Sequence, residues 1–126
     1  MGQQQLLLIT LGVIIIAIAI AVGLLMFGTA SVGSNKDALI NDVAGLAANA
    51  CQYRLRITAM GGGGGSFAGY TIPARIVSND NGTLAVVSAT RSTIVFCATS
   101  ALGYGSITTT VDSSGSMSNF TYTGEF

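Results

Sequence analysis

The feature that most constrains this chain is an uncharged apolar run near its start, residues 6–27, in which Thr10 is the only plainly polar side chain. As a helix the run would be about 33 Å long, enough to cross the roughly 30 Å hydrocarbon core of a bilayer. It has no polar face, so its whole circumference needs a cover of lipid or protein. The remaining residues are too few to wrap it, which argues against the buried helix of a soluble domain.

Three interpretations of this run compete. A cleaved secretory signal normally has a basic start and a shorter apolar stretch, whereas residues 1–5 carry no basic side chain and Thr29-Ala30-Ser31 is a poor cleavage signal. A plain signal anchor fits the length, but the first charge in the chain is Lys36, so no basic residue flanks the run to orient it. The third interpretation is a filament subunit whose apolar helix leaves the bilayer and packs against copies of itself.

Residues 34–60 form a second helical stretch. Ser34, followed three residues later by Asp37, makes either a capping-box-like helix start or a polar turn within one long helix. Apolar side chains recur at spacings of three and four, the pattern of one buried helix face: Leu39, Val43, Leu46, Ala50, Tyr53, Ile57 and Met60. Polar side chains occupy the other face: Asn41, Asp42, Asn49, Gln52, Arg54 and Arg56. We therefore expect residues 1–33 to form a transmembrane or filament-core helix and residues 34–60 to cover a small head.

A glycine-rich loop, residues 61–69, follows the second helical stretch. Residues 61–65 are all glycine, and each costs a helix about 1 kcal/mol relative to alanine, so the helix must stop here. We interpret the loop as a flexible connector to the first strand. A phosphate-binding loop is not supported, because the Gly-Lys-Ser/Thr ending is missing and the glycines follow a helix instead of preceding one.

Residues 70–126 switch to an alternating, β-branched pattern that predicts four or five short strands. The stretches are GYTIPARIV, TLAVVSAT, STIVFCAT, GSITTTV and SNFTYT. Asn81-Gly82 is a hairpin signal between the first two, and Pro73 restricts the first strand to an edge or a bulge. Short connections favour an antiparallel meander, covered on one face by the apolar stripe of the helix. The predicted fold class is α+β: a long N-terminal helix packed on a small antiparallel sheet.

Two cysteines and two asparagines are candidate modification sites. Cys51 on the helix and Cys97 in a predicted strand suggest a disulfide in an exported chain, with two buried free thiols or a reactive pair as alternatives. Asn81 and Asn119 each begin an Asn-X-Thr sequence, the acceptor pattern for N-linked glycans.

Charge and composition argue against several other classes of function. Five basic and five acidic residues give no net charge, so no basic surface is offered to nucleic acid. The chain has no His, which removes most metal sites, most general-base chemistry and a CxxCH haem attachment. We expect no enzyme activity, cofactor or metal.

An apolar N-terminal helix, an amphipathic extension, a glycine loop and a small antiparallel sheet together resemble a type IV pilin. The resemblance covers the whole chain in architecture, but its sequence-specific part is residues 1–27. It implies processing by a prepilin peptidase, insertion in the inner membrane, and drawing by an assembly machinery into an extracellular homopolymer with no activity of its own. Fibres of this family serve adhesion, motility and DNA uptake.

The resemblance also assigns roles to residues, with two departures from the family pattern. The family's glutamate near the mature N-terminus is replaced by Gln5 if the mature chain begins at Met1, so a charge attraction is lost although an amide still accepts a hydrogen bond. No basic leader precedes Met1; cutting after Gly2 would instead leave Gln3 first, which resembles archaeal pilins. The implied filament core consists of Leu6, Leu7, Leu8, Ile9, Leu11, Val13, Ile14, Ile15, Ile16, Ile18, Ile20, Val22, Leu24, Leu25 and Phe27.

The leading hypothesis is therefore the major subunit of a type IV pilus-like filament, membrane-embedded before assembly and extracellular afterwards. One alternative is a minor pilin or a pseudopilin of a secretion system, which shares the fold. The other is a signal-anchored surface module that binds a sugar or a protein. That module would need a concave aromatic cluster, for which the candidates are Phe67, Tyr70, Tyr104, Phe120 and Tyr122.

Overall fold

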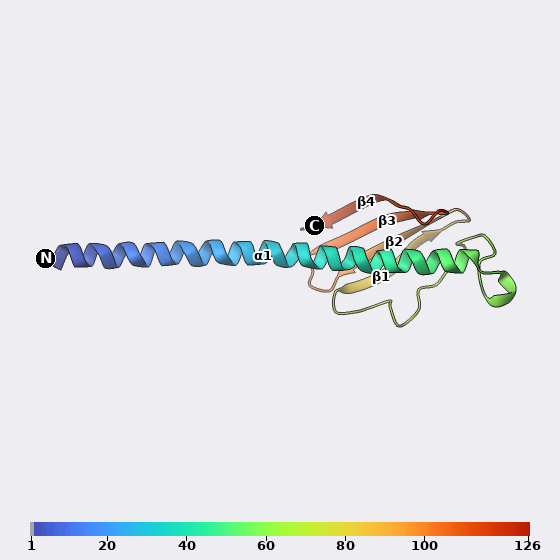
Figure 1. Cartoon of the computed structure of the whole chain (residues 1–126), viewed down its shortest axis with the longest axis horizontal. Helices are drawn as coiled ribbons and strands as arrows, with labels where there is room; N and C mark the ends of the chain where they lie inside the picture. The colour runs from blue at the N-terminus through green and yellow to red at the C-terminus, as the bar shows by residue number, and fades with distance from the viewer. Residues whose placement is uncertain (1) are drawn as a thin grey trace. The chain divides into compact units, whose positions relative to one another are not determined.

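The computed structural model describes residues 2–126 and shows one long helix followed by a four-stranded sheet (Figure 1). The elements are α1 (Gly2–Leu55), the 3-10 helix η1 (Thr58–Met60), β1 (Gly82–Ala89), β2 (Thr93–Ser100), β3 (Gly105–Asp112) and β4 (Met117–Gly124). This confirms the predicted α+β class. The chain divides into two compact units, a first that ends at Val32 and a second that comprises Gly33–Phe126.

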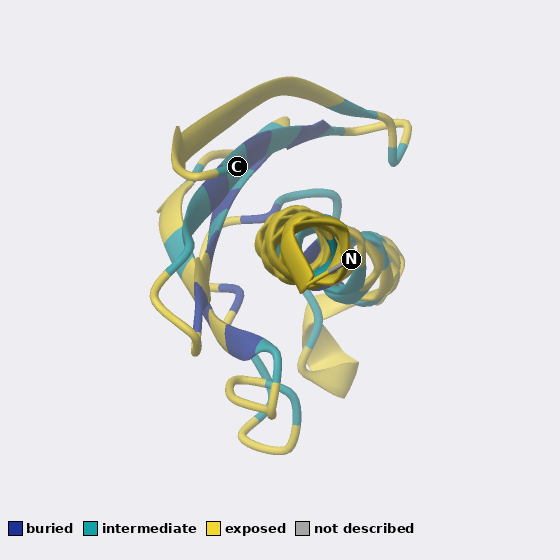
Figure 2. Ribbon diagram, turned by 90° about the vertical axis from the view of Figure 1, so that its left-hand side faces the viewer, coloured by how far each residue is buried: buried dark blue, intermediate teal, exposed yellow. Residues whose placement is uncertain are grey.

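The second unit is a sheet covered by the last part of α1. Figure 2 shows the sheet curved around one side of the helix, with the buried residues on the strands that face it. The predicted stripe is confirmed over its first four positions, since Leu39, Val43, Leu46 and Ala50 are all buried. They meet alternate residues of the central strands, as period-two side chains require: Ile94, Phe96, Ala98, Ile107 and Val111.

A buried polar contact, made by Asn35, helps to determine how the helix is positioned on the sheet. Asn35 is only 6 % exposed, yet its amide is satisfied on both sides. Its Nδ2 donates to the carbonyl oxygen of Asn81 at 3.1 Å, and its Oδ1 accepts from the hydroxyl of Ser100 at 2.6 Å. Because an unpaired buried amide would be unfavourable, these bonds favour one register of the helix on the sheet.

The sheet is an antiparallel meander in the order β1-β2-β3-β4. A bulge interrupts the β3–β4 pairing between Thr108 and Thr110, opposite Asn119, which has a φ of 54°. Asparagine tolerates this left-handed conformation better than most residues. In the β3–β4 turn, Asp112 Oδ1 accepts hydrogen bonds from the hydroxyl and backbone N–H of Ser114 and from the N–H of Ser116. These bonds hold the pKa of the Asp112 carboxyl below its usual value.

The stretch before β1 is not the strand that its alternating pattern predicted. Residues 69–77 form turns and irregular backbone around Pro73, and one isolated bridge joins Ser78 to Thr83. Proline has no N–H to donate to a ladder, so a strand through this position cannot be fully paired. The predicted Asn81-Gly82 turn is present: Asn79 Oδ1 accepts from the N–H groups of Asn81 and Gly82. It leads directly into β1 instead of joining two long strands.

The helix ends at Leu55, before the end that the apolar stripe predicted. Ile57 and Met60 are 59 % and 70 % exposed and cover no part of the sheet. Ser34 and Asp37 lie within α1, so of the two alternatives they form a polar stretch of one long helix and not a helix start.

The glycine loop caps the end of the helix, a role that its interpretation as a flexible connector did not include. Gly63 N–H donates to the Tyr53 carbonyl at 2.8 Å, Gly65 N–H to that of Arg54 at 2.7 Å, and Gly64 N–H to that of Arg56 at 2.9 Å. The carbonyls at a helix end have no partner within the helix, and here consecutive glycine amides supply one. Gly61, Gly64 and Gly65 have positive φ, whereas a Cβ on Gly62 or Gly63 would collide with backbone oxygens. The positive φ angles at three positions and the lack of space for a Cβ at the other two account for all five glycines of residues 61–65.

We predict that Gly63→Ala lowers the free energy of unfolding of the head by about 1–3 kcal/mol, because its Cβ would overlap the carbonyl of Ser66. The matched control is Gly45→Ala in the middle of α1, where nothing lies within 4 Å of the added Cβ. It should be neutral or stabilising by up to about 1 kcal/mol through helix propensity. Thermal unfolding of the full chain in detergent micelles, followed by near-UV circular dichroism, measures both. Equal stability of the two variants would contradict the role of the glycine loop as a cap of the helix.

Candidate functional site

The most exposed apolar surface of the described chain is the front of α1. Every residue of the expected filament core is exposed, from 48 % for Val22 to 77 % for Phe27. α1 is the one helix of the described residues that is long and apolar enough to cross a membrane, and it lies near the N-terminus. This surface requires a cover that the first unit does not contain.

The hydroxyl groups of Thr10 and Thr29 in the front of α1 are satisfied by the helix itself. Thr10 Oγ1 donates to the carbonyl oxygens of Leu6 and Leu7 at 2.8 and 2.9 Å, and Thr29 Oγ1 donates to that of Leu25 at 3.0 Å. The segment therefore exposes no unbonded hydroxyl, which suits an environment without water.

The N-terminal residues that the resemblance assigns to processing, within the described part of the chain, lie at the start of this helix. Gly2, Gln3 and Gln5 lie in the first turns of α1 and are exposed, whereas Met1 lies outside the described residues.

The predicted disulfide is absent, because Cys51 and Cys97 are both free. Cys97 alternates with Phe96 and Ala98, which face the core, so its side chain lies on the opposite face of the sheet. Cys51 packs against the core on the helix side. The sheet therefore separates the two sulfurs, a relation that spacing along the chain does not reveal. Burial raises the pKa of the Cys51 thiol, which makes it a poorer nucleophile.

The two candidate glycan acceptors differ in their surroundings. Asn81 is half-buried, and its Nδ2 donates to Asp42 Oδ2 at 3.4 Å while its carbonyl is held by Asn35. Asn119 is exposed in the bulge of β4. Of the two, Asn119 is the sterically accessible acceptor.

Four of the five candidate aromatic residues do not form a single concave cluster: Phe67, Tyr70, Phe120 and Tyr122. Phe67 and Tyr70 are buried in the core, and Tyr70 packs edge-on against Phe96 with ring centroids 6.1 Å apart. Phe120 and Tyr122 stack on β4 at 6.2 Å, and Lys36 Nζ lies 4.1 Å from the centre of the Tyr122 ring. Core packing and a surface cation–π contact account for these four rings.

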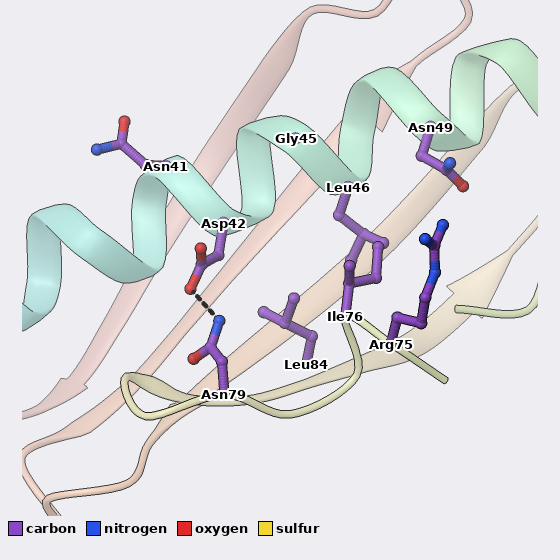
Figure 3. A pocket seen from close by; sticks show the side chains of 9 residues that line it. All are labelled: Asn41, Asp42, Gly45, Leu46, Asn49, Arg75, Ile76, Asn79 and Leu84. Atoms are coloured by element: carbon purple, nitrogen blue, oxygen red, sulfur yellow. Dashed lines mark hydrogen bonds between the residues drawn. The ribbon is translucent and has the colours of Figure 1, made fainter. Parts of the chain in front are cut away.

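A pocket of about 330 Å³ lies in the second unit between α1, the irregular segment before β1, and β1 itself (Figure 3). Its lining residues are Asn41, Asp42, Gly45, Leu46, Asn49, Arg75, Ile76, Asn79 and Leu84. Three apolar side chains form its floor, and its polar groups come from the helix face expected to be solvated and from the loop around Pro73. The sequence pattern does not predict this pocket, because the loop that carries Arg75 and Asn79 is brought against α1 only by the fold.

Comparisons with known proteins identify no relative of this chain. No family model, no curated protein and no solved structure matches it. Among the described residues, no group of three or more His, Cys, Asp or Glu side chains is placed to hold a metal ion.

Tyr70 is buried in the core and contacts Asn49 in the pocket wall. Ionisation of its hydroxyl should make the stability of the head depend on pH. Its hydroxyl donates to Asn49 Oδ1 at 2.7 Å, and burial raises its pKa to about 12. A folded pKa above the unfolded value of about 10 favours the folded state while the phenol is protonated. This contribution is complete below about pH 10 and is lost as the pH rises towards 12.

We therefore expect the free energy of unfolding to decrease between about pH 10 and pH 12, and Tyr70→Phe to remove part of that decrease. Urea unfolding of both proteins across this range measures the difference. Because Tyr70→Phe also loses the bond to Asn49, it should be about 1 kcal/mol less stable at neutral pH. Identical pH dependence in the two proteins would contradict the assignment.

Proposed function

We propose that this chain is the structural subunit of a type IV pilus-like filament. The observation that carries the proposal is the exposed apolar surface of residues 6–27 on a helix that continues into a folded head. Such a surface is stable in a bilayer before assembly and between copies of the same helix afterwards. The proposed location is the membrane first and an extracellular fibre second, and the role requires no catalytic group.

Assembly in this proposal is an exchange of lipid contacts for helix contacts. Since lipid tails are as apolar as the helix, burial of this surface against other copies gives little hydrophobic gain, and close packing must supply the difference. Gly12 and Gly23 have open space around their missing Cβ atoms, which allows helices to approach closely there. Gln3 and Gln5 would offer amide hydrogen bonds in place of the ion pair of the resembled family.

The alternative of a signal-anchored binding module is kept because of the head pocket, which has the size of a small-molecule site. In that case the front of α1 remains in the membrane and the pocket, not polymerisation, is the function. A minor pilin or pseudopilin would share the fold and differ in abundance.

We predict that Ile15→Asp abolishes filaments, because a carboxylate in the middle of an apolar span costs about 2.5–3.5 kcal/mol in every copy. The matched control is Val87→Asp, which places the same charge at a residue of β1 that is 61 % exposed. Electron microscopy of material sheared from cells counts the filaments, and immunoblotting of membranes verifies that both variants are produced. Filaments in normal number from Ile15→Asp would contradict the proposal that this chain assembles through its apolar helix.

A conservative second variant separates loss of packing from loss of the chain. Ile15→Leu keeps the apolar character and volume, so it should insert and polymerise. If Ile15→Asp is missing from the membrane altogether, Gly12→Leu tests the same interface without a charge. Its larger side chain should reduce filaments while the chain remains in the membrane, and normal filaments from it would count against close packing of the helices at this glycine.

A further inference from the structure

The head pocket has opposite charges at its two ends, and its polar groups are only partly used by the protein. Figure 3 shows Arg75 and Asn49 at one end and Asp42 with Asn79 at the other. Asp42 and Asn49 are seven residues apart on α1, which corresponds to about 10 Å along the helix. A ligand that contacts both ends must therefore be elongated.

The first end offers hydrogen-bond donors. Arg75 is exposed and makes no hydrogen bond or ion pair with the described residues, so its guanidinium is available. Asn49 Oδ1 accepts from the Tyr70 hydroxyl at 2.7 Å, which fixes the amide and leaves the two N–H groups of Nδ2 for a ligand. A guanidinium beside an amide donor matches a carboxylate, which arginine binds with two parallel hydrogen bonds.

The second end offers an acceptor. Asp42 Oδ2 accepts from Asn79 Nδ2 at 2.8 Å and from Asn81 Nδ2 at 3.4 Å. Both bonds end on the same oxygen, so Oδ1 remains available for a donor. The two amides hold the carboxylate in place, which reduces the loss of side-chain entropy when a ligand binds.

The wall between the two ends is apolar and its mouth is open. Leu46, Ile76 and Leu84 form the floor, and Gly45 lies on the helix at the rim. Glycine in a helix interior costs about 1 kcal/mol relative to alanine, and no atom within 4 Å requires it here. A glycine at this position, which has no side chain, keeps the rim of the pocket open to a ligand.

We propose that the pocket binds a short zwitterionic peptide, with its carboxylate on Arg75 and Asn49 and its ammonium group on Asp42. An extended tripeptide spans about 10 Å, which matches the separation of the two ends. The aliphatic floor takes small apolar side chains, and the absence of an aromatic ring from the lining favours a peptide over a sugar. This inference is independent of filament formation, since it concerns the second unit alone.

The test is a titration of the full chain in detergent micelles with Ala-Ala-Ala, followed by NMR of the Asn49 and Asn79 side-chain amides and the Gly45 backbone amide. We expect these signals to shift. The amidated and N-acetylated forms of the same peptide, which each lack one charge, should bind about tenfold more weakly or worse.

Matched variants locate the two charges. Arg75→Gln should weaken binding about tenfold or more, whereas Arg91→Gln, an exposed arginine outside the lining, should leave it unchanged. At the other end, Asp42→Asn should weaken peptide binding in the same way, whereas Asp80→Asn, at an exposed residue outside the lining, should leave it unchanged. Gly45→Ala should narrow the mouth and weaken binding without loss of stability, which separates a binding defect from a folding defect.

Three results would overturn the proposal. They are the absence of shifts at millimolar Ala-Ala-Ala, equal affinity of the charged and capped peptides, and binding of glucuronate without binding of the peptide. Normal filaments from Ile15→Asp together with intact peptide binding would count against the assembly proposal alone, whereas lost filaments without peptide binding would count against this one alone.

Discussion

The structure depends on one constraint: residues 6–27 present apolar side chains in every direction around a helix, and nothing in the first unit covers them. The internal bonding of Thr10 and Thr29 leaves no polar group that would favour water. Lipid or another apolar helix must therefore complete this surface. The head can remain small because it does not have to bury the segment, and its sheet needs to cover only the second part of α1.

The head achieves its order through local polar contacts as well as burial. Asn35 connects the helix to the turn before β1 and to the end of β2, while the glycine run closes the helix on its own carbonyls. These contacts replace the covalent staple expected from the cysteines. A small domain without a disulfide relies on such satisfied polar groups to select one arrangement of its apolar core.

Much of the fold could be predicted from periodicity. The stripe through Leu39 and Val43 and the alternation in β2 specify which faces meet, and both were readable because burial follows a period of 3.6 or 2. Two features were not readable: the cysteines lie on different sides of the sheet, and the glycines bond to a helix end. A third was readable only in part, since Pro73 restricted the first predicted strand to an edge or a bulge but did not show that the strand is absent. Each depends on backbone geometry that composition does not encode. The pocket was missed for the same reason, because Arg75 and Asp42 are brought together only by the fold.

The most direct test of filament assembly is the structure of the material sheared from cells, determined by cryo-electron microscopy and identified by intact mass. We predict helical filaments with residues 6–27 of every copy packed together at the centre and the sheets outside. A sheared fraction without this chain, together with a front helix that remains accessible to lipid-phase labelling in the membrane, would contradict it.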